Sequence, residues 1–340
     1  MTRALVVDDS SFMRTVIADQ LREHDVEVVG TARTGEEAVE LVERLEPDVV
    51  TMDVEMPEMD GIEAVERIMA SRPTPIVMLS AHTEDGAAAT LDALDRGAVD
   101  VMAKPGGEVS VEMAQVAEEL VRKVETAAEV DVGSGGPGRV PDEVSFPDTT
   151  EPATVIVGAS TGGPRVIEDV MSALPNAGGM KVLIVQHMPP EFTAQFARRL
   201  DAESDFDVRE AVDGDVLRPG EVAVAPGDAH LRVADRTAEG LHLAVDDDAP
   251  VHSVRPAIDV TMESAADVLE ERLVGVLLTG LGRDGSEGAR AIKRAGGTVI
   301  AQDEETAQVF GIPGRAIDGG HVDDVRPSDE VPQAIVEAVE

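Results

Sequence analysis

ALVVDDS (4–10) is a short apolar run that ends in two acids, and it sets the architecture expected for the first half of the chain. The segment after it, residues 10–23, is expected to form a helix with Ser10 or Ser11 as its N-cap and with Phe12, Val16, Ile17 and Leu21 on one face. Further apolar runs lie at 26–32, 47–53, 75–80 and 99–105, with a helical pattern or polar segment between successive runs. Strands that alternate with helices of this length predict a doubly wound parallel sheet.

A second pattern of the same kind begins at ATVIVGAS (153–160), after a segment rich in Gly, Pro, Ser and acids. Its other strand candidates are 181–187, 272–280 and 297–303. Shorter strand-like pieces between 205 and 260, such as EVAVAPG (221–227) and GLHLAV (240–245), indicate a small hairpin-rich insertion. We therefore expect two α/β domains, a flavodoxin-like one at 1–122 and a Rossmann-like one at 153–340, joined by a flexible linker at 123–152.

The composition excludes several classes of function. A formal net charge of -40 argues against nucleic acid or an anionic membrane as a partner, because both would be repelled. The absence of cysteine excludes a disulfide framework, a thiolate nucleophile and a Cys-based zinc site. No apolar run approaches the ~18 residues of a membrane span, and the N-terminus lacks the apolar length of a signal peptide, so we expect a cytoplasmic protein.

The excess of acids also indicates an environment. The chain has 68 Asp and Glu against 28 Lys and Arg, and only four of these bases are lysines. Such a surface repels itself unless salt screens it, so we expect a halophilic protein from a salt-rich cytoplasm. An acidic protein of a mesophile is the alternative, and unfolding measured at several salt concentrations distinguishes the two.

Polar side chains mark the carboxyl ends of four expected strands in the first domain. Asp8 and Asp9 follow the first strand and Asp53 ends the third, while Ser80 and Lys104 end the fourth and fifth. Ligands bind at this edge of a parallel sheet, where three carboxylates would repel unless a hard cation such as Mg²⁺ held them. A metal-bound aspartate can attack a phosphoryl group, with Lys104 and Ser80 close to the added phosphate. Solvated strand-end residues without a joint role are the alternative.

The first domain resembles the receiver domain of two-component response regulators over about residues 2–122. The matching pieces are VVDDS (6–10), MDVEMPEMDGIE (52–63), LSA (79–81) and AKP (103–105). The resemblance implies that a histidine kinase phosphorylates Asp53. It also implies that Asp8 and Asp9, with Asp53 and the backbone carbonyl of Glu55, hold Mg²⁺.

GASTG (158–162) fits the pattern G-x-S-x-G between an apolar strand and a helix that starts near Pro164. This geometry lifts Ser160 onto a tight strand-to-helix corner, as a nucleophile requires. The N–H groups at the start of the helix can also stabilise a developing oxyanion. Glycine-rich turns after strands bind phosphate as well, so the pattern alone leaves both interpretations open.

A serine nucleophile needs a base and an acid that orients the base. His187 is the best candidate of the seven histidines, because it ends a buried strand in the domain of Ser160; His230 and His252 are weaker candidates. Asp284, in LLTGLGRDG, suits the acid, although RDGS is also a good turn sequence. The order Ser, His, Asp differs from that of the α/β-hydrolases, which argues against that family but not against the chemistry.

The second domain resembles the catalytic domain of the chemotaxis protein-glutamate methylesterases, the CheB family, over about residues 153–338. The matching pieces are IVGASTGGP (156–164), VQHMP (185–189), VAPGDAH (224–230), SVRPAIDV (253–260), LLTGLGRDG (277–285), AQD (301–303) and FGIPGRA (310–316). Leu281 and Ile312 stand where the family usually has Met. Both exchanges are apolar, and the one at Leu281 could shift a backbone contact to the oxyanion.

The resemblance implies a phosphorylation-activated methylesterase without a cofactor in its catalytic domain. Ser160 would attack methylated glutamates of chemoreceptors, His187 would take the serine proton, and Asp284 would orient the imidazole. Backbone amides near Thr161 and Leu281 would bind the oxyanion. Related enzymes also deamidate receptor glutamines, and the unphosphorylated receiver is expected to block the cleft.

Other functions remain possible from the sequence. One is a receiver-linked signalling module whose C-terminal domain is catalytically silent, and another is a general esterase of small molecules. A DNA-binding response regulator conflicts with the net charge of -40.

Overall fold

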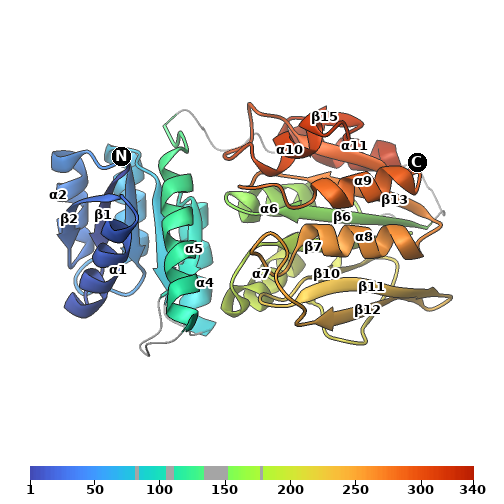
Figure 1. The fold of residues 1–340 in the computed structure, drawn as a ribbon, viewed down its shortest axis with the longest axis horizontal. Coiled ribbons are helices and arrows are strands. Elements are labelled where there is room, and N and C mark those ends of the chain that lie inside the picture. The colour runs from blue at the N-terminus through green and yellow to red at the C-terminus, as the bar shows by residue number, and fades with distance from the viewer. Residues whose placement is uncertain (81–83, 105–110, 134–151, 177–178) are drawn as a thin grey trace. The chain divides into compact units, whose positions relative to one another are not determined.

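The computed structural model describes residues 1–80, 84–104, 111–133, 152–176 and 179–340 (Figure 1). The chain divides into two compact units, Met1–Gly136 and Pro137–Glu340. Within the described ranges, no helix has both the length and the apolar character needed to cross a membrane.

The first unit is a five-stranded parallel sheet of order β2-β1-β3-β4-β5 with helices between its strands. Its strands are β1 (Arg3–Val7), β2 (Glu27–Ala32), β3 (Val49–Asp53), β4 (Ile76–Ser80) and β5 (Asp100–Ala103). Its helices are α1 (Ser11–Glu23), α2 (Gly35–Leu45), α3 (Gly61–Ser71), α4 (Glu84–Asp95) and α5 (Val111–Ala128). The flavodoxin-like prediction is confirmed, and the strand order reverses between β1 and β3, where such sheets bind ligands.

Helix α1 shows how local sequence fixes this unit, and where the expected helical face was wrong. Ser10 caps the helix by accepting a hydrogen bond from the backbone N–H of Met13. Ile17 and Leu21 are buried, but Phe12, which we expected beside them, is 65% exposed. Phe12 precedes Leu21 by nine residues, which at ~100° per residue places it on roughly the opposite side of the helix.

Helix α5 continues beyond the predicted domain end at residue 122. Lys123 is buried in this helix, and its Nζ lies 2.7 Å from Oδ1 of Asp100 on β5. This buried ion pair packs the helix against the sheet, and residues 123–128, which we expected in the linker, are helical. Residues 134–151 of the expected linker lie outside the described residues.

The second unit is built on a seven-stranded parallel sheet of order β15-β14-β13-β6-β7-β10-β8. Its strands are β6 (Ala153–Ala159), β7 (Met180–Gln186), β8 (Asp207–Glu210), β10 (Glu221–Val224), β13 (Arg272–Leu277), β14 (Thr298–Gln302) and β15 (Asp324–Arg326). Its helices are α6 (Gly163–Ala173), α7 (Pro190–Glu203), α8 (Ile258–Val268), α9 (Ser286–Arg294), α10 (Ile312–Asp318) and α11 (Val331–Val339), with a 3₁₀ turn at Ser328–Glu330. The Rossmann-like prediction is confirmed, and the strand order reverses between β6 and β13.

The predicted insertion is a small antiparallel sheet of β9 (Val216–Leu217), β12 (Gly240–Asp246) and β11 (His230–Thr237). The piece EVAVAPG, which we had placed in it, instead forms β10 and joins the main parallel sheet. Helix α8 packs between the two sheets (Figure 1), since its Ile258 and Met262 share a core cluster with residues of β11 and β13.

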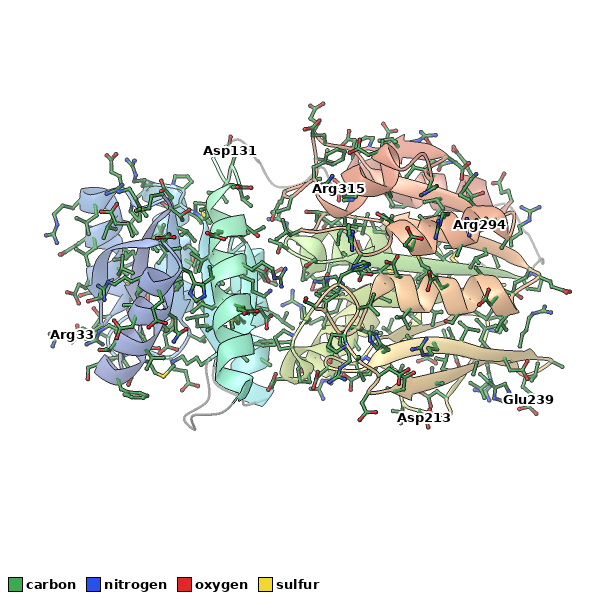
Figure 2. All side chains as sticks on the ribbon, viewed as in Figure 1. Arg33, Asp131, Asp213, Glu239, Arg294 and Arg315 are labelled. Atoms are coloured by element: carbon green, nitrogen blue, oxygen red, sulfur yellow. The ribbon has the colours of Figure 1, made fainter. Side chains whose placement is uncertain are left out.

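Charged side chains cover the surface of both units. In Figure 2 the labelled side chains of Asp131, Asp213 and Glu239 point outward into solvent. The chain carries 68 acids and 28 bases, so acids greatly outnumber the bases that could pair with them. This excess is the structural counterpart of the halophilic composition.

Candidate functional sites

Three carboxylates of the first unit converge at the carboxyl edge of its sheet. Asp8 and Asp9 follow β1 and Asp53 ends β3, and oxygens of the three groups lie within 4.8 Å of one another. Asp8 and Asp53 are buried, whereas Asp9 is exposed. The reversal of strand order between β1 and β3 brings these residues together from distant parts of the sequence.

Lys104 partly balances this negative charge. Its Nζ lies 2.7 Å from Oδ1 of Asp53 and 2.9 Å from Oδ2 of Asp8. Burial nevertheless raises the pKa of Asp53, and the charge of Asp8 adds to that effect, while the hydrogen bond from Lys104 opposes it. One ammonium therefore leaves three clustered carboxylates short of positive charge.

The acidic cluster opens into a cavity of about 650 Å³. Asp9, Asp53, Glu55, Ser80 and Lys104 all contribute to its lining. Glu55 also donates its backbone N–H to Oδ1 of Asp53 at 3.3 Å. Mg²⁺ prefers oxygen ligands and keeps several waters, so an acidic cluster beside a cavity of this size fits a hydrated magnesium ion.

Ser160 stands at a sharp corner between β6 and α6. The helix begins directly after Gly162, whose φ of 77° is in the left-handed region, and Pro164 lies in the first turn. A side chain is strained at this φ, so the bend favours glycine. The corner presents Ser160 where the strand order reverses, the usual place for chemistry in such a sheet.

His187 is placed beside Ser160 by strand pairing. Ala159 of β6 is opposite Gln186 of β7, and the backbone N–H of His187 donates to the carbonyl of Ala159 at 3.1 Å. The side-chain amide of Gln186 donates to the carbonyl oxygens of Ser160 at 2.9 Å and His187 at 3.1 Å. Gln186 was not singled out from the sequence, because a glutamine at a strand end gives no signal of such a contact.

Asp284, in the loop after β13, meets the ring of His187. Its Oδ2 lies 2.8 Å from Nε2 of His187 and accepts the backbone N–H of Ile258 at 2.6 Å. Its Oδ1 accepts the N–H groups of Asp259 and Gly285, both at 3.0 Å. The carboxylate is thus held at the N-terminus of α8, where the helix dipole favours negative charge.

These contacts set the charge of Asp284. Burial by itself raises its pKa, but the hydrogen bond from His187 and the N–H groups of Asp259 and Ile258 together lower that pKa below the ordinary value. Asp284 is therefore an ionised group that can orient and stabilise an imidazolium.

The second ring nitrogen of His187 is not engaged by Asp284. Its Nδ1 is buried and has no hydrogen-bond partner among the described residues. Because Asp284 holds Nε2, Nδ1 is the ring atom left to accept a proton, and the Ser160 hydroxyl does not hydrogen-bond to it in this structure.

The loop that contains Leu281 packs directly against the corner. A Cβ on Gly280 would approach Cβ of Ser160 to 2.7 Å, so backbone of this loop runs beside the serine. Thr279 joins the two segments, since its hydroxyl donates to the carbonyl of Thr161 at 3.0 Å. Thr161 and Leu281 thus lie in the two backbone segments that border Ser160.

The two weaker histidine candidates have other partners. His230 is buried, with Nε2 3.2 Å from the carbonyl oxygen of Ala249 and Nδ1 accepting the N–H of Ala257 at 3.2 Å. Nε2 of His252 lies 2.9 Å from Oδ2 of Asp259. Both rings therefore bind elsewhere, and His187 is the histidine that pairs with Asp284.

Comparisons with known proteins match both units of the chain. The model of the CheB methylesterase family matches residues 155–335, and that of the response regulator receiver domain matches residues 4–117. A protein-glutamate methylesterase/protein-glutamine glutaminase of Halobacterium salinarum is 51% identical over 344 residues, covering 100% of this chain and 99% of that protein. One of the same name from Thermotoga maritima is 44% identical over 342 residues, covering 99% and 98%.

A solved structure supports the fold of the second unit. The crystal structure of the Thermotoga maritima CheB methylesterase catalytic domain matches 56% of this chain and 98% of its own, with 40% identity and a TM-score of 0.52. The likeness to a haloarchaeal relative agrees with the halophilic composition.

Fold and sites together define a two-domain α/β protein in which a response-regulator receiver precedes a catalytic domain of the methylesterase type. The chain belongs to the CheB methylesterase family.

Proposed function

We propose that this chain is a phosphorylation-activated protein-glutamate methylesterase that demethylates glutamate methyl esters of chemoreceptors and also deamidates receptor glutamines. The observation that carries the proposal is the His187–Asp284 pair beside the strand-to-helix corner of Ser160. The family and the printed names of relatives along the full chain support the same substrate class.

In the proposed reaction the Ser160 hydroxyl attacks the ester carbonyl of a methylated glutamate. Nδ1 of His187 takes the serine proton as the carbon–oxygen bond forms, and returns it to methoxide so that methanol leaves. Water then attacks the acyl-enzyme with the same proton transfers, and releases a glutamate carboxylate and free Ser160. Glutamine deamidation follows the same course, with ammonia as the leaving group.

Two further elements stabilise the charges of this reaction. Asp284 stays ionised and stabilises the imidazolium that forms on His187. Backbone N–H groups of Thr161 and Leu281 border Ser160 and are proposed to bind the oxyanion, each contributing roughly 3 kcal/mol to the transition state.

The receiver is proposed to regulate this site. Asp53 accepts a phosphoryl group from a histidine kinase. Asp8, Asp9, Asp53 and the carbonyl of Glu55 would hold Mg²⁺, which would supply positive charge to offset that of the phosphoryl group. Lys104 then pairs with the phosphate, and the Ser80 hydroxyl turns toward it. If the catalytic cleft is closed in 99% of molecules before phosphorylation, opening it in 99% of them requires that phosphorylation stabilise the open state over the closed state by about 5.5 kcal/mol.

We also propose domain limits from these elements. The receiver ends after α5 at Ala128, and the catalytic domain begins at β6 with Ala153.

Methanol release tests the proposal. Methyl-labelled receptor is incubated with the wild type, with Ser160→Ala, and with Ser172→Ala, a control in which an exposed serine of α6 is removed. We expect methanol from the wild type and from Ser172→Ala, and none above background from Ser160→Ala.

The other outcomes identify the competing functions. No methanol from the wild type, with or without a phosphodonor, would indicate a catalytically silent signalling module. Hydrolysis of small esters without hydrolysis of receptor would indicate a general esterase.

A further inference from the structure

A second histidine–aspartate pair lies directly behind Asp284. Nε2 of His252 is 2.9 Å from Oδ2 of Asp259, and one ligand-type atom from each of His252, Asp259 and Asp284 lies within 4.8 Å of the others. Asp259 is buried, while the side chain of His252 is 23% exposed. The mechanism proposed above does not use this pair.

Arg283 sets the hydrogen-bonding role of each nitrogen of the His252 ring. Its Nε lies 3.3 Å from Nδ1 of His252 and can only donate, so Nδ1 is an acceptor without a proton. The ring proton is therefore on Nε2, which donates to Asp259.

The backbone around His252 is shaped to present this ring. Val251 and Val254 exchange backbone hydrogen bonds of 3.1 and 3.0 Å, which closes a two-residue turn over His252 and Ser253. These two residues have φ of 53° and 64°, in the left-handed region that side chains disfavour. A turn with positive φ at both central positions normally contains glycine or asparagine, so this one is held by its contacts.

Asp259 links this pair to the catalytic carboxylate. Its own backbone N–H is one of the donors that hold Asp284, and it lies in the first turn of α8. Its Oδ1 accepts the N–H of Gly288 of α9 at 2.7 Å. The two helices approach closely at Gly288, where a Cβ would lie 2.5 Å from Cβ of Met262. Burial and the charge of Asp284 raise the pKa of Asp259, so its hydrogen bonds oppose a repulsion between two neighbouring carboxylates.

We propose that His252 is a positioning residue of this enzyme: by holding the side chain of Asp259, it fixes the first turn of α8, whose N–H groups orient Asp284 toward His187. The inference rests on the proposed hydrolase function of Ser160, His187 and Asp284. It predicts that loss of the His252 hydrogen bond slows the chemical step and leaves substrate binding intact.

The test compares two amides at position 252. In His252→Gln the side-chain nitrogen replaces Nε2 and can still donate to Asp259, whereas in His252→Asn it is too short to reach. We expect kcat of His252→Asn to fall about 10- to 100-fold, within the cost of a ~1 Å misplacement, with KM changed less than about twofold. His252→Gln should keep most of the activity, as should the control His242→Ala, a histidine of β12 whose ring contacts Thr237.

A double-mutant cycle with Asp284→Asn separates positioning from general damage. If His252 acts through Asp284, the His252→Asn exchange costs little once Asp284 is already replaced. The rate of Ser160 labelling by a fluorophosphonate is measured for every variant beside methanol release, and melting temperatures verify that each is folded.

The proposal would be overturned if His252→Asn lowered kcat equally in the wild type and in Asp284→Asn. It would also be overturned if His252→Asn and His252→Gln lowered kcat equally. Wild-type activity in His252→Asn would do the same. Absence of methanol from the wild type would count against the receptor substrate alone, because the labelling rates of Ser160 still decide the role of His252.

Discussion

In the receiver, three carboxylates meet one lysine beside an open cavity, whereas in the catalytic domain the carboxylate of Asp284 is surrounded by donors. Both sites lie where the strand order of a parallel sheet reverses. Burial raises the pKa of Asp53 despite Lys104, while burial at Asp284 is outweighed by His187 and two backbone N–H groups, so its pKa is lowered. The same sheet geometry thus gives a receiver site that requires added positive charge and a catalytic site in which hydrogen-bond donors already stabilise the carboxylate.

The largest expected effect is the loss of the catalytic site. Asp284→Asn removes the carboxylate that accepts a hydrogen bond from Nε2 of His187. The ring proton can then lie on Nδ1, where it prevents Nδ1 from accepting the proton of Ser160. We expect kcat for methanol release to fall on the order of 10⁴-fold, with or without a phosphodonor. If a phosphodonor restored methanol release in Asp284→Asn, Asp284 would not be essential to the catalytic site, which would contradict this comparison.

Asp53→Asn should abolish activation and leave basal activity, whereas Asp284→Asn should abolish basal activity. It leaves the catalytic residues untouched, so basal methanol release continues, but a small-molecule phosphodonor no longer activates. In the wild type we expect activation of about 5- to 150-fold, the usual range for coupling between two sites. Activation that survives in Asp53→Asn would show that the phosphate is carried elsewhere.

Magnesium should stabilise only the site that lacks positive charge. At a hundredfold excess over its Kd, Mg²⁺ should raise the free energy of unfolding of the receiver by about 2.7 kcal/mol. The melting transition of the catalytic domain should not move, and neither should that of the receiver in Asp53→Asn. Asp19→Asn, an exchange at an exposed acid of α1, is the control that keeps the response.

The smallest effects concern pH. The raised pKa of Asp53 means that its contribution to stability is fully present below the unfolded pKa near 3.8 and is lost as pH rises through the folded pKa. The lowered pKa of Asp284 means that its contribution is present above 3.8 and is lost as pH falls through the folded pKa.

Without Mg²⁺ at pH 7, Asp53→Asn should therefore stabilise the receiver and Asp284→Asn should destabilise the catalytic domain, and both differences should shrink toward pH 3. Thermal melts at several pH values measure this, since ~1 kcal/mol moves Tm by roughly 2–8 °C. Shifts of equal sign in the two variants would contradict the comparison.

The sequence predicted the fold well because its signals are local. Apolar runs followed by polar strand ends located most strands, and Ser10 caps α1 as its position suggested. The errors have two causes. Phe12 fits an apolar pattern, but ~100° per residue turns it away from Leu21 and toward solvent. Helix α5 continues past residue 122, and its Lys123 pairs with Asp100 on β5, a contact that the local sequence does not indicate.

The site residues were proposed one at a time, and their contacts depend on tertiary structure. The sequence indicated Ser160 by its glycine-rich corner and Asp284 by its place after a strand. It gave no sign that the N-terminus of α8 would hold Asp284, because Ile258 and Asp259 donate backbone N–H groups that any residue has. It also gave no sign that Gln186 would join Ser160 to His187.

The orientation of the His187 ring has a chemical consequence. Asp284 occupies Nε2, so an alkylating substrate analogue that reacts with this base would leave its carbon on Nδ1. Acid hydrolysis of the treated protein would then release the pros isomer of alkylhistidine, whereas a ring held through Nδ1 by its acid, as in chymotrypsin, yields the tele isomer. Chromatography of two isomeric amino acids can thus report which nitrogen acts as the base.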